Sequence, residues 1–191
     1  TIKELNLDPE HFRVAIFGSS RLQKDSETYQ GVFDLAYELG KVDMDVVTGG
    51  GPGLMEAANN GHHKGLDEVG SDAKSIGLRI ELPFEEYANK HLDVQKDFKR
   101  FSGRLDAFME VSNLVVVAPG GVGTLLELAY TWQLMQVGHI CKTPIILIGD
   151  MWHQFYDWAA STFVKEGLAN REDLDILIPA PNYQAALTLI K

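Results

Sequence analysis

The chain has 191 residues, which suits one domain with a substantial core, and its 45% hydrophobic and 23% charged residues are typical of a soluble globular protein. Its formal net charge of −10 disfavours a broad nucleic-acid-binding surface, which would need a basic face. The single cysteine excludes a disulfide within the chain, and no Cys/His array has metal-site spacing. No apolar run is long enough to span a bilayer. We therefore expect a cytoplasmic protein without a metal or membrane partner.

Strand-like and helix-like segments alternate along the whole chain. Polar stretches at 66–74 and 83–96 are the expected long loops. Apolar runs predict strands at residues 14–17, 45–47, within 75–82, and at 114–118, 144–148 and 176–178. Apolar periodicity with capping residues predicts helices from Ser26 to Gly40, from 54 to about Gly61, and over 98–111, 125–136, 152–165 and 183–190.

About six strands that alternate with helices predict an α/β fold, with one parallel sheet and helices on both of its faces. We expect a single Rossmann-like domain over residues 1–191, in which residues 1–12 are an N-terminal extension. Within it, four aromatic residues on one predicted helix have a spacing suited to packing, and they are predicted to belong to the core: Trp152, Phe155, Tyr156 and Trp158.

Three predicted strands end in turns of small residues, at 18–20, 48–53 and 119–124. Ligands of open parallel sheets bind beyond the carboxyl ends of the strands, so the three turns would line one site. Glycines also serve tight turns and close helix–strand packing, which is the alternative explanation. Two of the turns open a helix, where free backbone N–H groups suit a phosphate, and this favours a ligand site.

Neither helix-opening turn spells a standard cofactor motif. The third glycine of a dinucleotide fingerprint is replaced by Leu54 in one turn and by Leu126 in the other, and no Gly-Lys-Ser/Thr sequence marks a P-loop. NAD binding and ATP hydrolysis are therefore disfavoured. A mononucleotide or another small phosphate ester fits better.

Glu127, about one turn inside the predicted 125–136 helix, is the first candidate for chemistry. A carboxylate is unfavourable beside a phosphate, whereas a reaction that develops positive charge would use it. The sequence Thr124-x-x-Glu127 also matches a capping box, in which the glutamate accepts from a backbone N–H group. The local sequence leaves both roles open.

Arg104, on the predicted helix over 98–111, is the second candidate. Lys96, Arg100 and Arg104 recur every fourth residue and would form one row of like charges. A bound anion, or Asp93 and Asp97, would relieve their repulsion. A solvated basic face is the alternative.

Two glycine-rich motifs follow the second and fourth predicted strands, Thr48-Gly-Gly-Gly-Pro-Gly-Leu-Met55 and Pro119-Gly-Gly-Val-Gly-Thr-Leu-Leu-Glu127. With these motifs the chain resembles, from about Arg13 to the C-terminus, the LOG family of nucleoside 5′-monophosphate phosphoribohydrolases, many of which were long mislabelled lysine decarboxylases. The resemblance also includes Phe17-Gly-Ser-Ser20 and Ile80-Glu-Leu-Pro83. The resemblance implies hydrolysis of AMP or a cytokinin-type nucleotide to a free base and ribose 5-phosphate, without a cofactor, by a homodimer or a higher homo-oligomer.

The resemblance carries the family's catalytic arginine and glutamate over to Arg104 and Glu127. The family pattern has a lysine directly after the arginine, where this chain has Leu105. The turns and their neighbours would bind the substrate and its phosphate through Gly18, Ser19, Ser20, Gly49, Gly50, Gly51, Gly53, Met55, Gly120, Gly121, Gly123 and Thr124.

Leu105 supports a second hypothesis, a non-catalytic protein that binds or carries a nucleotide or a phosphorylated cofactor, as molybdenum-cofactor carriers do. In this hypothesis the glycine turns still bind the ligand, but Arg104 and Glu127 catalyse no reaction. A pyridoxal-phosphate decarboxylase is disfavoured, because the chain is short for such an enzyme and offers no evident partner for the cofactor ring.

Overall fold

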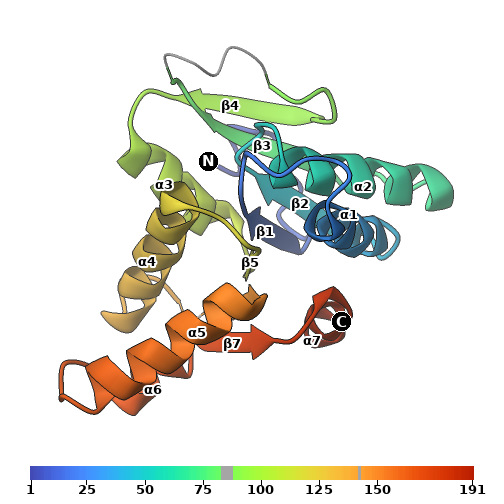
Figure 1. Cartoon of the computed structure of the whole chain (residues 1–191). Coiled ribbons are helices and arrows are strands. Elements are labelled where there is room, and N and C mark those ends of the chain that lie inside the picture. The colour runs from blue at the N-terminus through green and yellow to red at the C-terminus, as the bar shows by residue number, and fades with distance from the viewer. Residues whose placement is uncertain (83–87, 142) are drawn as a thin grey trace.

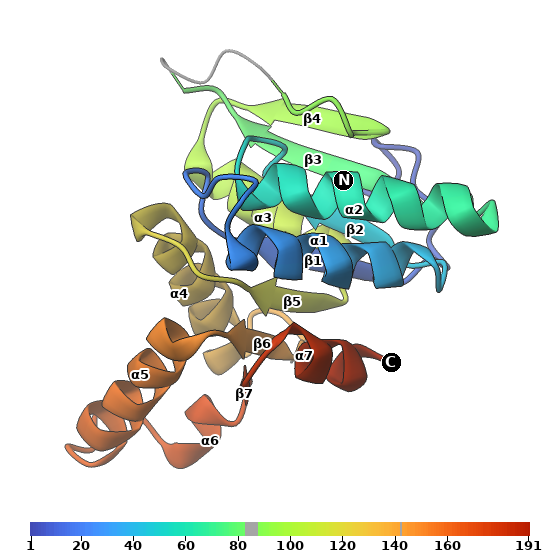
Figure 2. The same cartoon turned by 45° about the vertical axis from the view of Figure 1, so that its right-hand side comes forward.

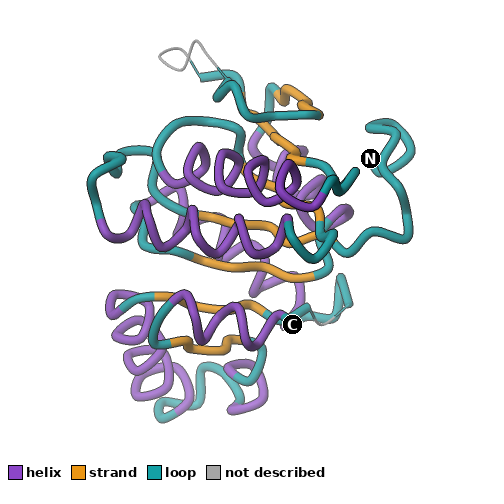
Figure 3. Tube along the Cα trace, turned by 90° about the vertical axis from the view of Figure 1, so that its right-hand side faces the viewer, coloured by secondary structure: helices purple, strands orange, loops and turns teal. Residues whose placement is uncertain are grey.

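The computed structural model describes residues 1–82, 88–141 and 143–191, and within them seven parallel strands form one sheet. The strands follow one another in the order β4-β3-β2-β1-β5-β6-β7, and they lie one below another in Figure 3. This arrangement confirms the predicted α/β fold. The strands are β1 (Arg13–Phe17), β2 (Asp45–Thr48), β3 (Ser75–Ile80), β4 (Val94–Phe98), β5 (Leu114–Val117), β6 (Ile145–Ile148) and β7 (Leu177–Ala180).

Helices cover both faces of the sheet, as Figure 1 shows, with α1, α2 and α7 on one side and α3 and α4 on the other. Figure 2 brings the α1–α2 side to the front. No helix in the described ranges is both long and apolar enough to cross a membrane. The helices are α1 (Glu27–Gly40), α2 (Leu54–Val69), α3 (Phe101–Val111), α4 (Val122–Gln136), α5 (Asp150–Ala159), the π-helix η1 (Ala160–Val164), α6 (Arg171–Leu174) and α7 (Tyr183–Ile190).

Strands β5 and β6 are apolar throughout, and β1 is apolar from Val14 to Phe17, because both faces of these strands are buried. Along β1, Val14 and Ile16 face the α1–α2 layer, whereas Ala15 and Phe17 face the α3–α4 layer. Phe17 meets Phe108 of α3 edge to face, with ring centroids 5.0 Å apart. These two cores hold the carboxyl ends of β1, β2 and β5 in fixed positions, and the three turns begin there.

The strand order reverses between β1 and β5, since β1 pairs with β2 on one side and with β5 on the other. The crevice at such a reversal is where open α/β sheets bind ligands. The Ser19 N–H group donates to the Pro119 carbonyl at 3.0 Å and joins the two loops that leave this point. Two of the predicted turns are therefore adjacent in space.

The helix predicted to end near Gly61 continues to Val69, through part of the predicted 66–74 loop. Gly61 allows the close approach of two helices and does not end one. A Cβ atom at Gly61 would lie 2.1 Å from the Phe33 carbonyl oxygen of α1, and one at Gly65 would lie 2.1 Å from that of Tyr37. The prediction was wrong because sequence does not separate a glycine at a helix end from one at a helix–helix contact.

The prediction was also wrong around β4, which begins within the expected 83–96 loop and ends at Phe98, the first residue of the expected helix. The strand is at the sheet edge and carries polar residues, so its apolar signal is weak. Residues 83–87 of that loop, with Pro83 of the LOG motif, lie outside the described residues.

The predicted row of basic charges does not exist, because its three members do not lie within one helix. Lys96 lies in β4 and pairs with Glu4, and Arg100 is the N-cap residue of α3. Arg104 lies within α3 and is buried. Of the expected acidic partners, Asp97 instead pairs with Arg79.

The aromatic prediction for residues 152–165 holds in part. Trp152 is buried and donates its Nε1–H to the Ala118 carbonyl at 2.9 Å. Phe155 and Tyr156 are partly buried against the same core, whereas Trp158 is half exposed and was wrongly placed there. The α-helix ends at Ala159 and continues as the π-helix η1.

Candidate active site

A cavity of about 480 Å³ opens at the carboxyl edge of the sheet, where the three predicted turns meet. It brings together ten of the residues predicted for the site: Gly18, Ser19, Ser20, Gly49, Met55, Arg104, Gly121, Gly123, Thr124 and Glu127. Five lining residues were not predicted: Arg21, Ile80, Leu82, Phe101 and Val122. The other predicted residues, Gly50, Gly51, Gly53 and Gly120, are not among those that line it.

A buried ion pair forms the chemical centre of this cavity. Arg104 of α3 donates from Nη2 to Oε1 of Glu127 of α4 at 3.1 Å, and the two side chains are only 9% and 11% exposed. The Arg104 Nε–H also donates to the Leu78 carbonyl at 2.8 Å, and the guanidinium lies 5.4 Å from the Phe108 ring centroid. Arg104 is thus oriented by β3 and α3, and it orients Glu127 in turn.

The capping-box role of Glu127 is wrong. Helix α4 begins at Val122 with Gly121 as its N-cap residue, so Thr124 is the third helical residue and Glu127 the sixth. A glutamate in this box must be the third residue to reach back to the N-cap N–H group. The sequence suggested the box because the helix was expected to start three residues later.

Burial has a direct effect on the acidity of this carboxyl. It raises the pKa of Glu127 from 4.5 to about 7, and the Arg104 guanidinium opposes the rise. A carboxyl with this pKa exchanges protons near neutral pH, as a general acid or base must. A pKa displaced by burial and one specific partner, inside a cavity, marks a candidate functional group.

Close packing accounts for several of the glycines. A Cβ atom at Gly49 would lie 2.4 Å from Nη2 of Arg104, and one at Gly53 would lie 2.5 Å from the Ser19 carbonyl oxygen. At Gly120 it would lie 2.1 Å from Oγ1 of Thr124. These positions need glycine for the packing of the turns around the cavity.

Gly121 and Gly123 differ from those glycines. A Cβ atom at either position would meet nothing within 4 Å, so internal packing does not require glycine there. Both residues are exposed and line the cavity at the start of α4. The N–H groups of Val122, Gly123 and Thr124 precede the first intrahelical bond, which runs from Leu125 N to the Gly121 carbonyl at 2.9 Å, and are therefore free for an anion.

A buried polar network that the sequence did not reveal holds the 48–53 turn. Oδ1 of Asn59 accepts from the Thr48 hydroxyl at 2.7 Å and from Asn89 Nδ2 at 2.9 Å. The Gly50 N–H group donates to the Thr48 hydroxyl at 2.9 Å, and Asn89 Nδ2 also donates to the Gly51 carbonyl at 3.1 Å. Asn59 and Asn89 thus fix the turn from behind, and nothing in their spacing indicated it.

Leu105, which stands where the family pattern has a lysine, is buried and only 3% exposed. It is not among the residues that line the cavity. Arg104 and Glu127 remain paired in its presence.

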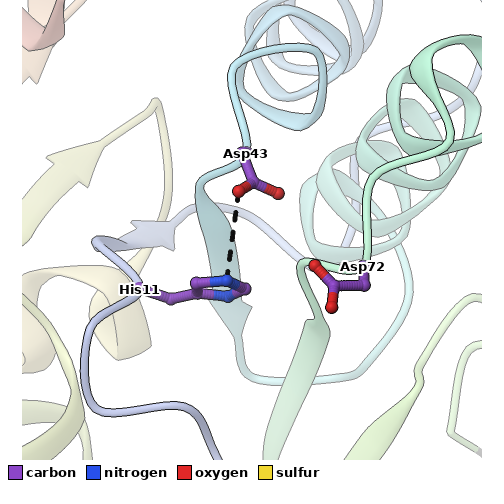
Figure 4. Close-up of side chains that lie close together, drawn as sticks. All are labelled: His11, Asp43 and Asp72. Carbon is purple, nitrogen blue, oxygen red and sulfur yellow. Dashed lines mark ion pairs between the residues drawn. The ribbon is translucent and has the colours of Figure 1, made fainter.

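At the opposite edge of the sheet, His11, Asp43 and Asp72 lie close together (Figure 4), and each offers one ligand atom within 4.8 Å of the others. Nε2 of His11 lies 4.0 Å from Asp43, and its Nδ1 lies 3.1 Å from the buried Asp45. The three residues precede β1, β2 and β3, so they lie at the amino ends of these strands, and none of them lines the cavity. Asp43 and Asp72 are exposed, and exposed acidic groups are common without an ion, so the cluster alone does not indicate a metal site. The metal-free protein expected from the sequence stays a prediction.

Comparison with known families identifies the chain. A family model described as "Possible lysine decarboxylase" matches residues 55–190. The chain belongs to this family, which is the LOG family of its glycine motifs. The match includes Glu127, Arg104 and the start of α4, and it leaves β1, β2 and the turns that follow them outside.

A curated relative of this LOG-family chain is the pyrimidine/purine nucleotide 5′-monophosphate nucleosidase of Escherichia coli strain K12. The two are 32% identical over 120 residues, which cover 59% of this chain and 26% of the relative. The same protein from strain O157:H7 matches equally. The matched segment thus spans about a quarter of the length of these relatives.

Solved structures share the fold. The molybdenum cofactor binding protein of Rippkaea orientalis superposes with a TM-score of 0.70 at 17% identity, covering 96% of this chain and 97% of that protein. The molybdenum cofactor carrier protein of Chlamydomonas reinhardtii gives a TM-score of 0.67 at 16% identity, covering 95% and 96%. At these identities the likeness concerns the fold alone.

Proposed function

We propose that this LOG-family protein hydrolyses the N-glycosidic bond of a nucleoside 5′-monophosphate, such as AMP or a cytokinin-type nucleotide, to a free base and ribose 5-phosphate. The observation that carries the proposal is the buried Glu127, held by Arg104 and facing a cavity at the free N-terminal end of α4. The nucleosidase named above, which is similar over part of its length, supports the same class of reaction.

Glu127 suits the transition state of this reaction. As the bond from C1′ to the base breaks, positive charge develops on the ribose ring. An ionised Glu127 would stabilise that charge. It would also take a proton from the water that attacks C1′, while the leaving base keeps the bonding electron pair and is protonated from solvent. A pKa of about 7 leaves enough of the carboxyl ionised for this role at neutral pH.

Arg104 would position both the carboxylate and the substrate. Its Nε and Nη2 are occupied by Leu78 and Glu127. Guanidinium has five N–H donors, so donors remain for substrate hydroxyl groups. The free N–H groups at Gly123 and Thr124 would bind the 5′-phosphate, with the walls formed by the 18–20 and 48–53 turns.

The test is base release from a panel of nucleoside monophosphates, AMP first, followed by chromatography. Replacing Glu127 with Gln keeps the shape and a hydrogen-bond acceptor for Arg104 but removes the charge, and we expect turnover to fall by roughly a thousandfold or more. Glu56→Gln is the matched control, because Glu56 also pairs with a basic residue, Lys24, but does not line the cavity. Near-normal turnover in Glu127→Gln would contradict the proposal.

A second candidate is a non-catalytic carrier of a nucleotide or a phosphorylated cofactor. The absence of the family lysine at Leu105 and the fold shared with molybdenum cofactor proteins favour it. It predicts that the protein binds nucleotides, seen as a thermal shift, and releases no base from any of them.

We also propose that the protein forms a homodimer or a higher homo-oligomer through the outer side of α4. Leu125 and Leu126 are 40% and 42% exposed there, an apolar surface that a second copy would cover. This surface continues to Val122 at the edge of the cavity, which is 85% exposed. Sedimentation of the wild type and of Leu126→Asp, in which only the former is dimeric, would support this surface. The cytoplasmic location expected from the sequence stays a prediction.

A further inference from the structure

We propose that Arg21 binds the 5′-phosphate and that this contact makes the cavity select nucleotides over nucleosides. The inference rests on the proposed function, because it assigns the phosphate-binding end of the same cavity. Arg21 follows the Gly18-Ser19-Ser20 turn and is not among the residues predicted for the site.

The position of Arg21 places it beside the start of α4. Its loop leaves β1, and the loop before α4 leaves β5, the neighbouring strand. The Ser19 N–H group donates to the Pro119 carbonyl at 3.0 Å, which ties the two loops together. Arg21 and Gly121 both line the cavity, so a charged side chain and free backbone N–H groups serve one end of it.

The backbone of this loop is held while the arginine side chain is exposed. The Arg21 N–H group donates to the Ser19 hydroxyl at 3.1 Å, and its carbonyl accepts from Gln23 Nε2 at 3.1 Å. The Leu54 N–H group donates to the Ser19 carbonyl at 2.8 Å and anchors the loop on α2. The guanidinium can therefore reach a ligand without moving the turn that carries it.

Charge balance also singles out Arg21. Among the described residues that line the cavity, the charged side chains are Arg21, Arg104 and Glu127, and the last two neutralise each other at 3.1 Å. None of the ion pairs in the described ranges includes Arg21, whereas Lys24 on the same loop pairs with Glu56 at 2.9 Å. The cavity thus keeps one positive charge in a chain of net charge −10. Arginine matches phosphate oxygens with two parallel donors.

The other end of the cavity is apolar, which fixes the direction of the substrate. Ile80 and Leu82 at the end of β3 and Phe101 at the start of α3 line it there. β3 lies two strands from β1, or about 10 Å at the usual strand spacing. That separation suits a nucleotide with its phosphate at Arg21, its ribose at Glu127 and its base against Phe101.

The test compares the binding of AMP and of adenosine by calorimetry, in the Glu127→Gln background so that neither is consumed. We expect Arg21→Ala to weaken AMP binding roughly tenfold to a hundredfold, the usual value of hydrogen bonds to a charged group, and to leave adenosine binding unchanged. Arg21→Lys should recover part of the loss. Lys24→Ala is the control for overall charge, because it removes the same charge from the same loop outside the cavity.

Equal losses for AMP and adenosine, or equal losses in Arg21→Ala and Lys24→Ala, would overturn the inference. A wild type that binds AMP in this Arg21-dependent way but releases no base would overturn the hydrolase and leave the role of Arg21 intact. A wild type that binds neither AMP nor ribose 5-phosphate would overturn both.

Discussion

Two buried arginine–carboxylate pairs stand at opposite ends of the same sheet, and they differ in what else they bind. Arg104 and Glu127 lie 3.1 Å apart at the carboxyl ends of the strands, and Arg13 and Asp45 lie 3.4 Å apart at the amino ends. Both pairs are shielded from bulk solvent. Burial alone therefore does not distinguish a structural pair from a functional one.

The amino-end pair is satisfied by the protein itself. Asp45 accepts from the Lys74 N–H group at 2.7 Å and faces His11 Nδ1 at 3.1 Å. Arg13 donates to the Val111 carbonyl at 2.6 Å and to the Asp8 carbonyl at 2.7 Å. The whole group joins the N-terminal segment, β1, β2 and α3.

The carboxyl-end pair is left incomplete. In the part of the chain that the structure describes, Arg104 is the one side chain hydrogen-bonded to the Glu127 carboxylate, which borders the cavity. An ionised carboxylate can accept several hydrogen bonds, so Glu127 keeps acceptor capacity for a molecule in the cavity. This difference supports the proposal that a ligand completes the Glu127 pair, whereas the contacts of the Asp45 pair are all within the protein.

The largest expected contrast comes from truncating the structural carboxylate. Asp45→Ala should lower the free energy of unfolding by about 3–5 kcal/mol, because it leaves Arg13 buried without its partner. Urea unfolding measures this loss, and base release per folded molecule should stay near that of the wild type. Lost activity without lost stability would contradict the division of roles between the two pairs.

The pH dependence of stability sharpens the same comparison. Folded Glu127 keeps its proton up to about pH 7, whereas the unfolded chain gives it up near 4.5, so the folded state binds more protons between these values. Its contribution to stability is therefore lost as the pH rises through this window, by up to roughly 3 kcal/mol.

The measurement is the difference in unfolding free energy between the wild type and Glu127→Gln from pH 4 to pH 8, values chosen to bracket the two pKa values. A difference is needed because burial lowers the pKa of His62 to about 4, which gives the opposite slope in an overlapping range. A difference that does not change with pH would mean that Glu127 titrates normally.

Two glycines of the cavity should respond differently to alanine. Gly49→Ala would press a Cβ atom against Arg104, so it should lower the free energy of unfolding by about 1–3 kcal/mol and also lower turnover. Gly121→Ala meets open space, so stability should change by less than about 0.5 kcal/mol while AMP binding weakens. Thermal unfolding and calorimetric titration separate the two effects, and a Gly121→Ala protein that binds AMP normally would contradict the phosphate assignment.

The smallest expected effect lies away from both pairs. The Ser26 hydroxyl accepts from the Tyr29 N–H group at 3.1 Å and caps α1. Ser26→Ala should cost about 1 kcal/mol in urea unfolding without a change in turnover. Changed turnover at equal stability would show that α1 acts on the cavity directly.

The sequence predicted the parts of this protein whose signals are local. The cap at Ser26 and the apolar runs of β1 and β5 depend on neighbouring residues, and the structure has them where they were expected. Strand β4 was missed because three polar residues separate Val94 from Phe98, the two apolar residues that it packs against the core. The network of Asn59 and Asn89 was missed because it joins residues far apart in the chain, and only the fold brings them together.

The candidate site likewise contains residues that local motifs predicted and residues that only the fold brings together. The glycine turns and Glu127 could be located from motifs, but the start of α4, which removes the capping role, could not. Arg21 and Phe101 were not predicted as site residues because neither belongs to a recognisable motif, and only the folded structure brings both to the cavity.

The contact between α1 and α2 bears on how the cavity could close around a substrate. Gly61 and Gly65 bring α2 against the Phe33 and Tyr37 carbonyl oxygens, so these helices meet backbone to backbone. Side chains add to this contact, for example the hydrogen bond from the Tyr37 hydroxyl of α1 to the Glu68 carboxylate of α2, so we expect the two helices to move as one body. On the other face α3 and α4 meet through side chains, including a bond of 2.6 Å from the Tyr130 hydroxyl to Asp106. Substrate-driven motion is therefore expected on the α3–α4 side, with the α1–α2 layer as the stationary frame.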